Sequence, residues 1–253
     1  MARAAATNVT ANAGFGRCLL DLDRLTADQI RTVLRRAHEF AQLHPGERLE
    51  TLREADWIVI DEIKAAGVRI FAKHGYHAAK VSQIVKEVGV AQGTFYLYFK
   101  GKEPLFGEIL NDFLAMVVGT IADWEPSDLD TREALRGDLT RVGLMLTDVL
   151  TQNPEHTQIF FREALTVSQE FKEMIREFYE TLGAMLSSFN AILFDRGLIA
   201  RRNNRVLAYM TIGMVERVIQ EYVVHGVLED IPAREVVENL VLLYLEGTAP
   251  AAE

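Results

Sequence analysis

Residues 63–106 read IKAAGVRIFAKHGYHAAKVSQIVKEVGVAQGTFYLYFKGKEPLF. Apolar residues recur in this stretch at spacings of three and four, which is typical of amphipathic helices. A first helix, with Val68, Ile70 and Phe71 on its apolar side, is expected to end at Gly75, because glycine tolerates a positive φ past a helix end. A second helix follows with the apolar residues Val81, Ile84, Val85 and Val88. After a sharp turn at Gly89-Val90, residues 91–99 are expected to form a short third helix.

Two short helices that cross at a glycine-containing turn form the helix-turn-helix unit, whose second helix enters the major groove of DNA. We therefore expect residues 91–99 to read DNA. Gln92 suits a paired contact with adenine, and the methyl group of Thr94 suits a thymine methyl. Gly93 leaves room for a close approach. No arginine stands on this helix, so the commonest contact with guanine is absent from it.

The same stretch resembles the TetR family of repressors. The residues that stand where the family carries the corresponding ones are Phe71, Gly75, Ile84, Gly89, Val90, Gly93, Thr94, Tyr96, Phe99, Lys102 and Leu105. This resemblance covers roughly a fifth of the chain. It implies an all-α fold, with an N-terminal helix-turn-helix DNA-binding domain followed by a helical ligand-binding and dimerisation domain. It also implies a homodimeric, ligand-responsive repressor that binds a palindromic DNA operator and is released by a small, apolar molecule.

The expected DNA contacts combine the residues themselves with this resemblance. Family members usually place a hydroxyl residue where this chain has Ala79-Lys80, so an N-cap hydrogen bond worth about 1 kcal/mol is expected to be missing. Val85 stands where a small alanine is usual. The resemblance implies backbone contacts from Tyr96 and Tyr98, unless these rings only pack, and a contribution from Lys102. The full predicted set is Lys80, Ser82, Ala91, Gln92, Gly93, Thr94, Tyr96, Tyr98 and Lys102.

The charge is distributed unevenly along the chain. The formal net charge is −9, yet residues 53–107 carry +2, with eight Lys or Arg against six Asp or Glu. Residues 108–253 carry −12, with 12 basic and 24 acidic residues. Acidity that lies away from the reading helix limits nonspecific adhesion to DNA, which phosphate neutralisation otherwise drives.

Composition excludes several other classes. The single cysteine, Cys18, allows no internal disulfide and no cysteine-rich metal site. The first fifteen residues lack the apolar core of a signal peptide, and no uninterrupted apolar run reaches the ~18 residues of a membrane helix. We therefore expect a cytoplasmic protein without a membrane, metal or cofactor partner.

Pro, Gly and capping residues mark the expected helix ends and divide the chain into domains. We expect an N-terminal extension over 1–46, with a disordered start and then a helix over about 26–43, and a DNA-binding domain over 47–107. A helical ligand-binding and dimerisation domain is expected over 108–247, and a disordered tail over 248–253. The extension's helix carries Arg31, Arg35 and Arg36, so it either packs on its own domain or touches DNA or a second subunit.

Two residue sets in the large domain are candidates for binding. Aromatic and methionine side chains adapt to apolar ligands, which makes pocket candidates of Phe113, Met116, Trp124, Met145, Phe160, Phe161, Met174, Phe178 and Met185. Arg162 and Glu163 are the nearest charged residues for a polar ligand end. The last two helices are apolar on more than one face, which favours a four-helix dimer interface with Val215, Val218, Ile219, Tyr222, Val237, Leu240, Val241 and Tyr244.

Two other classes remain open at this stage. An all-helical enzyme is one, although the chain has no Gly-x-Ser-x-Gly, His-Glu-x-x-His or phosphate-loop motif. The other is a protein-interaction adaptor with a degenerate helix-turn-helix. Binding to duplex DNA separates a regulator from both.

Overall fold

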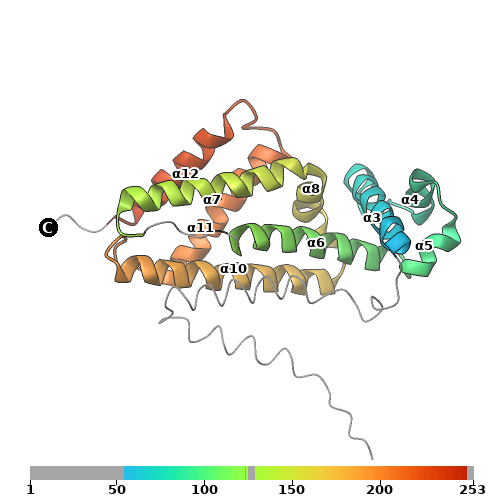
Figure 1. Cartoon of the computed structure of the whole chain (residues 1–253), viewed down its shortest axis with the longest axis horizontal. Helices are drawn as coiled ribbons and strands as arrows, with labels where there is room; N and C mark the ends of the chain where they lie inside the picture. Colours follow the sequence, from blue (N-terminus) through green and yellow to red (C-terminus); the bar gives the residue numbers. More distant parts are fainter. Residues whose placement is uncertain (1–53, 123, 125–128, 250–253) are drawn as a thin grey trace, which may run out of the picture.

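The computed structural model describes residues 54–122, 124 and 129–249. These residues form helices, with no strand among them (Figure 1). The expected N-terminal extension, with its helix over 26–43 and its three arginines, lies outside the described residues.

Three helices build the head of the molecule. They are α3 (Glu54–His74), α4 (Val81–Val88) and α5 (Gln92–Tyr98). Gly75, at φ +74°, follows the end of α3, and Gly89, at φ +82°, turns the chain between α4 and α5. Both glycines therefore occupy the left-handed region that the sequence analysis assigned to a helix end and a sharp turn.

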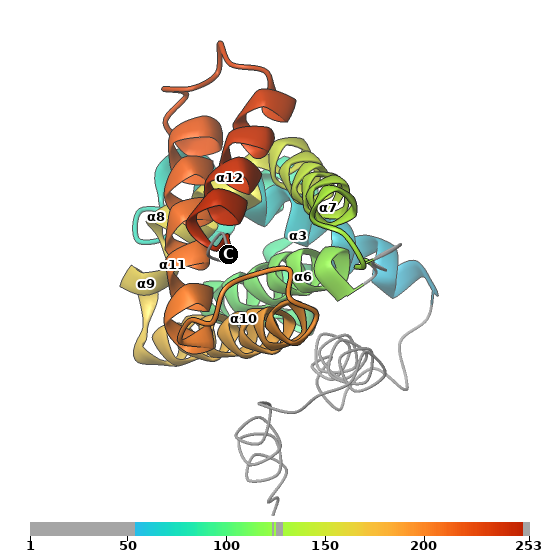
Figure 2. The ribbon, with the colours of Figure 1, turned by 90° about the vertical axis from the view of Figure 1, so that its left-hand side faces the viewer.

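The body contains the remaining helices. They are α6 (Lys102–Ala122), α7 (Arg132–Gln152), α8 (Pro154–Arg162), α9 (Ala164–Val167), α10 (Gln169–Asp195), α11 (Asn204–Ile219), the π-helix η3 (Gln220–Val224) and α12 (Ala233–Gly247). The long helices α6, α7 and α10 lead away from the head, and the end of α12 lies at the far end of the body (Figure 1). Seen along its length, the body places α6, α7, α10, α11 and α12 around a central axis (Figure 2).

Local signals explain several boundaries. The Thr131 hydroxyl accepts a hydrogen bond from Ala134 N–H at 3.1 Å and begins α7. Asn203 caps α11 in the same way through Val206 N–H at 3.1 Å. Pro154 occupies the first turn of α8, where its missing donor costs nothing. The chain changes from α11 to a π-helical turn at Gln220, which continues to Val224.

An aromatic cluster joins the head to the body. The Phe106 ring of α6 lies 5.5 Å from that of Phe71 and 5.0 Å from that of Tyr76, between centroids. It also lies 5.1 Å from the Phe171 ring of α10. All four residues are buried, and edge-to-face pairs of this kind add about 0.5–1.5 kcal/mol each to the free energy of burial.

Helix α6 is the central element of the body. By length and composition it is the one helix in the described part of the chain that is apolar enough to cross a membrane, although it contains Glu108 and Asp112. Its apolar side chains pack inside the protein, and the buried ones are Leu105, Phe106, Ile109, Leu110, Phe113, Leu114, Val117 and Val118.

The chain end differs from the expectation. Thr248 was predicted to begin a disordered tail, but it is buried and its carbonyl accepts a hydrogen bond from Ala200 N–H at 2.7 Å. Its hydroxyl donates to the Tyr244 carbonyl at 2.7 Å. The tail prediction is therefore wrong at this residue, because hydrogen bonds join it both to Ala200 and to Tyr244 of α12.

Candidate DNA-reading head and ligand cavity

The reading helix α5 is held by buried side chains on one face. Phe95 is fully buried and Phe99 nearly so, with their ring centroids 5.7 Å apart. Ile84 and Val85 of α4 belong to the same core. These contacts fix the direction in which the opposite face of α5 points.

The opposite face presents the predicted reading residues to solvent. Lys80, Ser82, Ala91, Gln92, Gly93 and Tyr96 are exposed, whereas Thr94 and Tyr98 are half-buried. A Cβ atom at Gly93 would meet no atom within 4 Å, so packing inside the protein does not require glycine there. Leu97 is 71% exposed and was not among the predicted contacts. Its signal in the sequence was an apolar residue on the polar face of a short helix.

The start of α4 is capped differently from what a hydroxyl residue would provide. Ala79 is buried, with 3% exposure, and Lys80 is the N-cap residue without a side-chain cap bond. The Gln83 side chain compensates in part, since its Oε1 accepts a hydrogen bond from Lys80 N–H at 2.8 Å. An ion pair between Arg69 and Glu87 further joins α3 to α4.

Lys102 has a different environment from the other predicted DNA contacts. Its Nζ donates to the carbonyls of Tyr76, His77 and Ala79 at 2.7, 3.1 and 3.1 Å. It also lies 4.5 Å from the centre of the Tyr76 ring. Because an ammonium group has three donors, this arrangement occupies all of them and holds the loop between α3 and α4.

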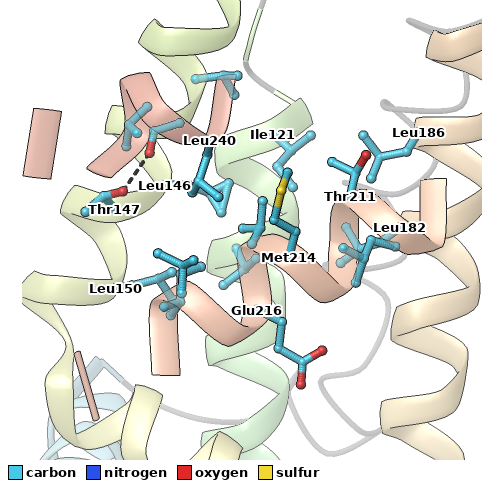
Figure 3. Close-up of a pocket in the computed structure, with 18 of the residues that line it drawn as sticks. Ile121, Leu146, Thr147, Leu150, Leu182, Leu186, Thr211, Met214, Glu216 and Leu240 are labelled. Carbon is cyan, nitrogen blue, oxygen red and sulfur yellow. Dashed lines mark hydrogen bonds between the residues drawn. The ribbon is translucent and has the colours of Figure 1, made fainter. Parts of the chain in front are cut away.

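The body encloses a cavity of about 320 Å³. Its walls come from α6, α7, α8, α10, α11, η3 and α12. Figure 3 shows Met214 and Ile121 pointing toward each other across it, with Leu146, Leu182 and Leu240 on other sides. The cavity is therefore lined mainly by aliphatic and aromatic side chains.

The polar groups of the wall are largely satisfied by the protein. Thr147 and Thr211 donate to carbonyls of their own helices at 2.8 and 2.9 Å. The Tyr179 hydroxyl hydrogen-bonds the Glu216 carboxylate, and burial together with that carboxylate raises the pKa of Tyr179. Figure 3 shows this carboxylate pointing away from Met214 and Ile121. Trp124 Nε1 is buried without a hydrogen-bond partner among the described residues.

The structure divides the predicted pocket residues. Phe113, Trp124, Phe160, Phe161, Phe178 and Met185 line the cavity. Met116, Met145 and Met174 do not: the Met116 sulfur accepts a hydrogen bond from Asn153, Met145 is exposed, and Met174 packs against the core near the head.

All eight residues predicted for the dimer interface also line this cavity. In a sequence, an apolar helix face does not reveal whether it meets a ligand or a second subunit, so the cavity-lining role of α11 and α12 has no signal of its own. The outer sides of these helices carry other exposed apolar residues, namely Val206, Met210, Leu242 and Leu243.

His156 lies between the cavity and the head. Its ring stacks on that of Phe113, with 6.2 Å between centroids. Burial lowers the pKa of His156, an effect that Asp112 and Glu155 oppose and that Lys64 reinforces. Lys64 and Asp112 form an ion pair beside it, so the imidazole belongs to a charged cluster that joins α3, α6 and α8.

Comparison with known proteins finds a family that matches the head of the molecule. The family described as "Bacterial regulatory proteins, tetR family" matches residues 63–109, which contain α4, α5 and the turn between them. In this part of the chain the protein therefore resembles the TetR family of transcriptional regulators. The curated proteins that it matches are regulators of transcription.

The similarity to some known regulators extends beyond the head. An uncharacterized HTH-type transcriptional regulator, YdgC of Bacillus subtilis (strain 168), is 26% identical over 178 residues, which are 70% of this chain and 87% of that protein. The fatty acid degradation regulator FadR from Bacillus halodurans has a similar structure, with a TM-score of 0.61, 25% identity and coverage of 74% of this chain and 95% of that one. The fold also resembles FadR from Bacillus subtilis in complex with stearoyl-CoA, with a TM-score of 0.58, 23% identity and coverage of 74% and 98%.

Proposed function

We propose that this protein is a ligand-responsive repressor that binds a palindromic operator as a homodimer and is released by a small, largely apolar effector. The observation that carries the proposal is that the same chain has an outward-facing reading helix and a separate apolar cavity. Two distinct sites on one molecule are the minimum that an allosteric regulator needs.

DNA recognition is assigned to α5 and the start of α4. Gln92 and Thr94 contact bases, and the exposed Leu97 is suited to a thymine methyl in the major groove. Lys80, Ser82, Tyr96 and Tyr98 surround this helix and are assigned to phosphates and sugars, which position the head without carrying sequence information.

The chemistry of the cavity limits the effector. Within the described part of the chain, the wall contains no Lys, Arg or His, and Glu216 is its one charged residue. A buried anion without a partner is strongly unfavourable. The portion of the effector inside the cavity is therefore a hydrocarbon such as an acyl chain, with any anionic head group outside. The ligand of the related FadR, stearoyl-CoA, has this division into an apolar chain and an anionic head.

The homodimer is assigned to the outer face of α11 and α12. Val206, Met210 and Gly213 lie on that side of α11, and Leu242 and Leu243 lie on that of α12. A Cβ atom at Gly213 would meet no atom within 4 Å, so nothing in one subunit fills the space beside it. A two-fold axis would pair this patch with itself and bury it in both copies.

One experiment tests the proposal directly. Fluorescence anisotropy with a labelled duplex from the DNA upstream of the protein's own coding region measures operator affinity, with and without stearoyl-CoA. We expect tight, salt-dependent binding that stearoyl-CoA weakens, while a scrambled duplex binds far more weakly. Equal affinity for both duplexes would rule out a sequence-specific regulator and return the adaptor to consideration.

A further inference from the structure

Glu163 connects the body of the molecule to the head. It lies between α8 and α9, and its Oε2 accepts a hydrogen bond from Tyr76 N–H at 3.1 Å, 87 positions earlier in the chain. A Cβ atom on Gly75 would approach Glu163 Oε1 to 3.3 Å, so the glycine also leaves room for the carboxylate. The contact therefore lies on the loop between α3 and α4.

The position of this carboxylate follows the position of α8. Glu163 N–H donates to the Ile159 carbonyl at 2.9 Å. The Glu163 carbonyl accepts from both the N–H and the hydroxyl of Thr166, each at 2.8 Å. With its backbone fixed at both sides, Glu163 has little freedom to remain on Tyr76 if α8 moves.

The loop that Glu163 contacts determines how α4 begins. Tyr76 is held by its N–H through Glu163, by its carbonyl through Lys102, and by its ring within the aromatic cluster. Four residues later, Lys80 is the N-cap of α4, which packs directly against α5. A shift of this loop therefore changes the orientation of the reading helix.

The other side of α8 reaches the cavity. Phe160 and Phe161, directly before this junction, line the cavity wall. Between them and Glu163, Arg162 donates to the Val224 carbonyl at 3.3 Å, at the end of the π-helix whose Tyr222 and Val223 also line the cavity. π-Helical turns are frequent at functional sites.

We propose that Glu163 is a positioning residue that transmits occupation of the cavity to the reading head. An effector that displaces Phe160 and Phe161 moves α8, withdraws the carboxylate from Tyr76 N–H and releases the α3–α4 loop from the orientation that fits the operator. The inference rests on the proposed function in that it assumes an effector in this cavity. The residue that senses the ligand and the residue that holds the head are then separated by one or two positions in the chain.

The test compares three variants of the full-length protein. Glu163→Ala removes the acceptor, Glu163→Gln keeps an oxygen acceptor in nearly the same place, and Glu155→Ala removes an exposed carboxylate from the same helix. Three quantities are measured: hydrogen exchange of the Tyr76 amide without DNA, operator affinity without effector, and the ratio of operator affinities without and with stearoyl-CoA.

We expect Glu163→Ala to accelerate exchange at Tyr76 and to weaken operator binding without effector about tenfold. That factor corresponds to about 1.4 kcal/mol, near the lower end for a hydrogen bond to a charged group. Since the variant has already lost the contact, stearoyl-CoA should weaken its operator binding much less than it weakens that of the wild type. Glu163→Gln and Glu155→Ala should stay within about twofold of the wild type in all three measurements, well below the tenfold change that 1.4 kcal/mol produces.

Two results overturn the inference. One is unchanged exchange at Tyr76 in Glu163→Ala. The other is faster exchange together with a wild-type operator affinity and a wild-type response, which would make Glu163 structural only. The proposed function fails separately, if the wild type does not bind the operator or does not respond to stearoyl-CoA. In that case exchange at Tyr76 and the affinity of Glu163→Ala without effector still decide the role of the carboxylate.

Discussion

Replacing Lys102 with alanine separates two roles that the sequence alone assigns to one residue. The resemblance to TetR repressors implies a contact with DNA, whereas the structure shows all three donors of Nζ engaged by carbonyls of Tyr76, His77 and Ala79. If the structural role dominates, the variant loses stability. If the phosphate role dominates, it loses an electrostatic contact with DNA.

The size of the stability loss follows from these contacts. His77 is exposed, and water can replace the ammonium at its carbonyl, while Tyr76 and Ala79 are buried. We therefore count the net loss as about one hydrogen bond to a charged group, or about 2–3 kcal/mol. For a chain of this size that corresponds to a decrease in Tm of about 4–12 °C.

Thermal unfolding and the salt dependence of operator binding measure the two roles independently. We expect the lower Tm and an unchanged slope of log K against log[salt], with Lys100→Ala as a control that removes a neighbouring exposed cation at wild-type Tm. A lost phosphate contact would instead flatten the slope by about 0.9. A wild-type Tm combined with that flatter slope would refute the structural role of Lys102.

Three further predictions concern the reading helix, the outer face and the buried imidazole. Gln92→Ala should weaken the free energy of binding to the specific operator by about 1–3 kcal/mol and relax the preference at one base pair. Binding to a panel of single-base operator variants measures this preference, and an unchanged profile would contradict the placement of α5 in the groove. Met210→Asp, at a side chain that is 65% exposed in one subunit, should give monomers in sedimentation velocity. The control Lys172→Asp on α10 should remain dimeric. A dimeric Met210→Asp would exclude the outer face of α11 and α12 as the interface. Burial lowers the pKa of His156 in the folded protein. As the pH falls below the ordinary value near 6.5, the unfolded chain therefore binds more protons than the folded protein. The free energy of unfolding should decrease as the pH falls from that value through the lowered pKa. Denaturant midpoints measured across pH 5–8 should decrease less at acid pH in His156→Gln than in the wild type. Identical pH profiles for the two proteins would show that His156 is not the source of the acid destabilisation.

The head could be predicted from sequence because its signals are local. Gly75 and Gly89 take the positive φ values expected of them, and the apolar spacing around Ile84 and Phe95 identifies the faces that the structure buries. Each of these inferences needs only a few neighbouring residues.

The cavity could be predicted only in part, because its walls come from helices far apart in the chain. An aromatic residue such as Phe160 looks the same in sequence whether it fills a core or lines a cavity. Val218 and Val241 were interpreted as interface residues for the same reason, yet they face the cavity. The contact of Glu163 with Tyr76 had no sequence signal, because the two residues are 87 positions apart.

Helix α11 lines the cavity on one side and is exposed on the other, and this has a consequence for regulation. Met214 and Val215 face the cavity, while Met210 and Gly213 face outward on the same rigid rod. A ligand that displaces the inner face of α11 also moves the outer patch assigned to the second subunit. The head is governed by a different route, through α8 and Glu163. Because the two routes diverge at the cavity, variants at Glu163 should uncouple DNA release while leaving any ligand effect on dimer stability intact.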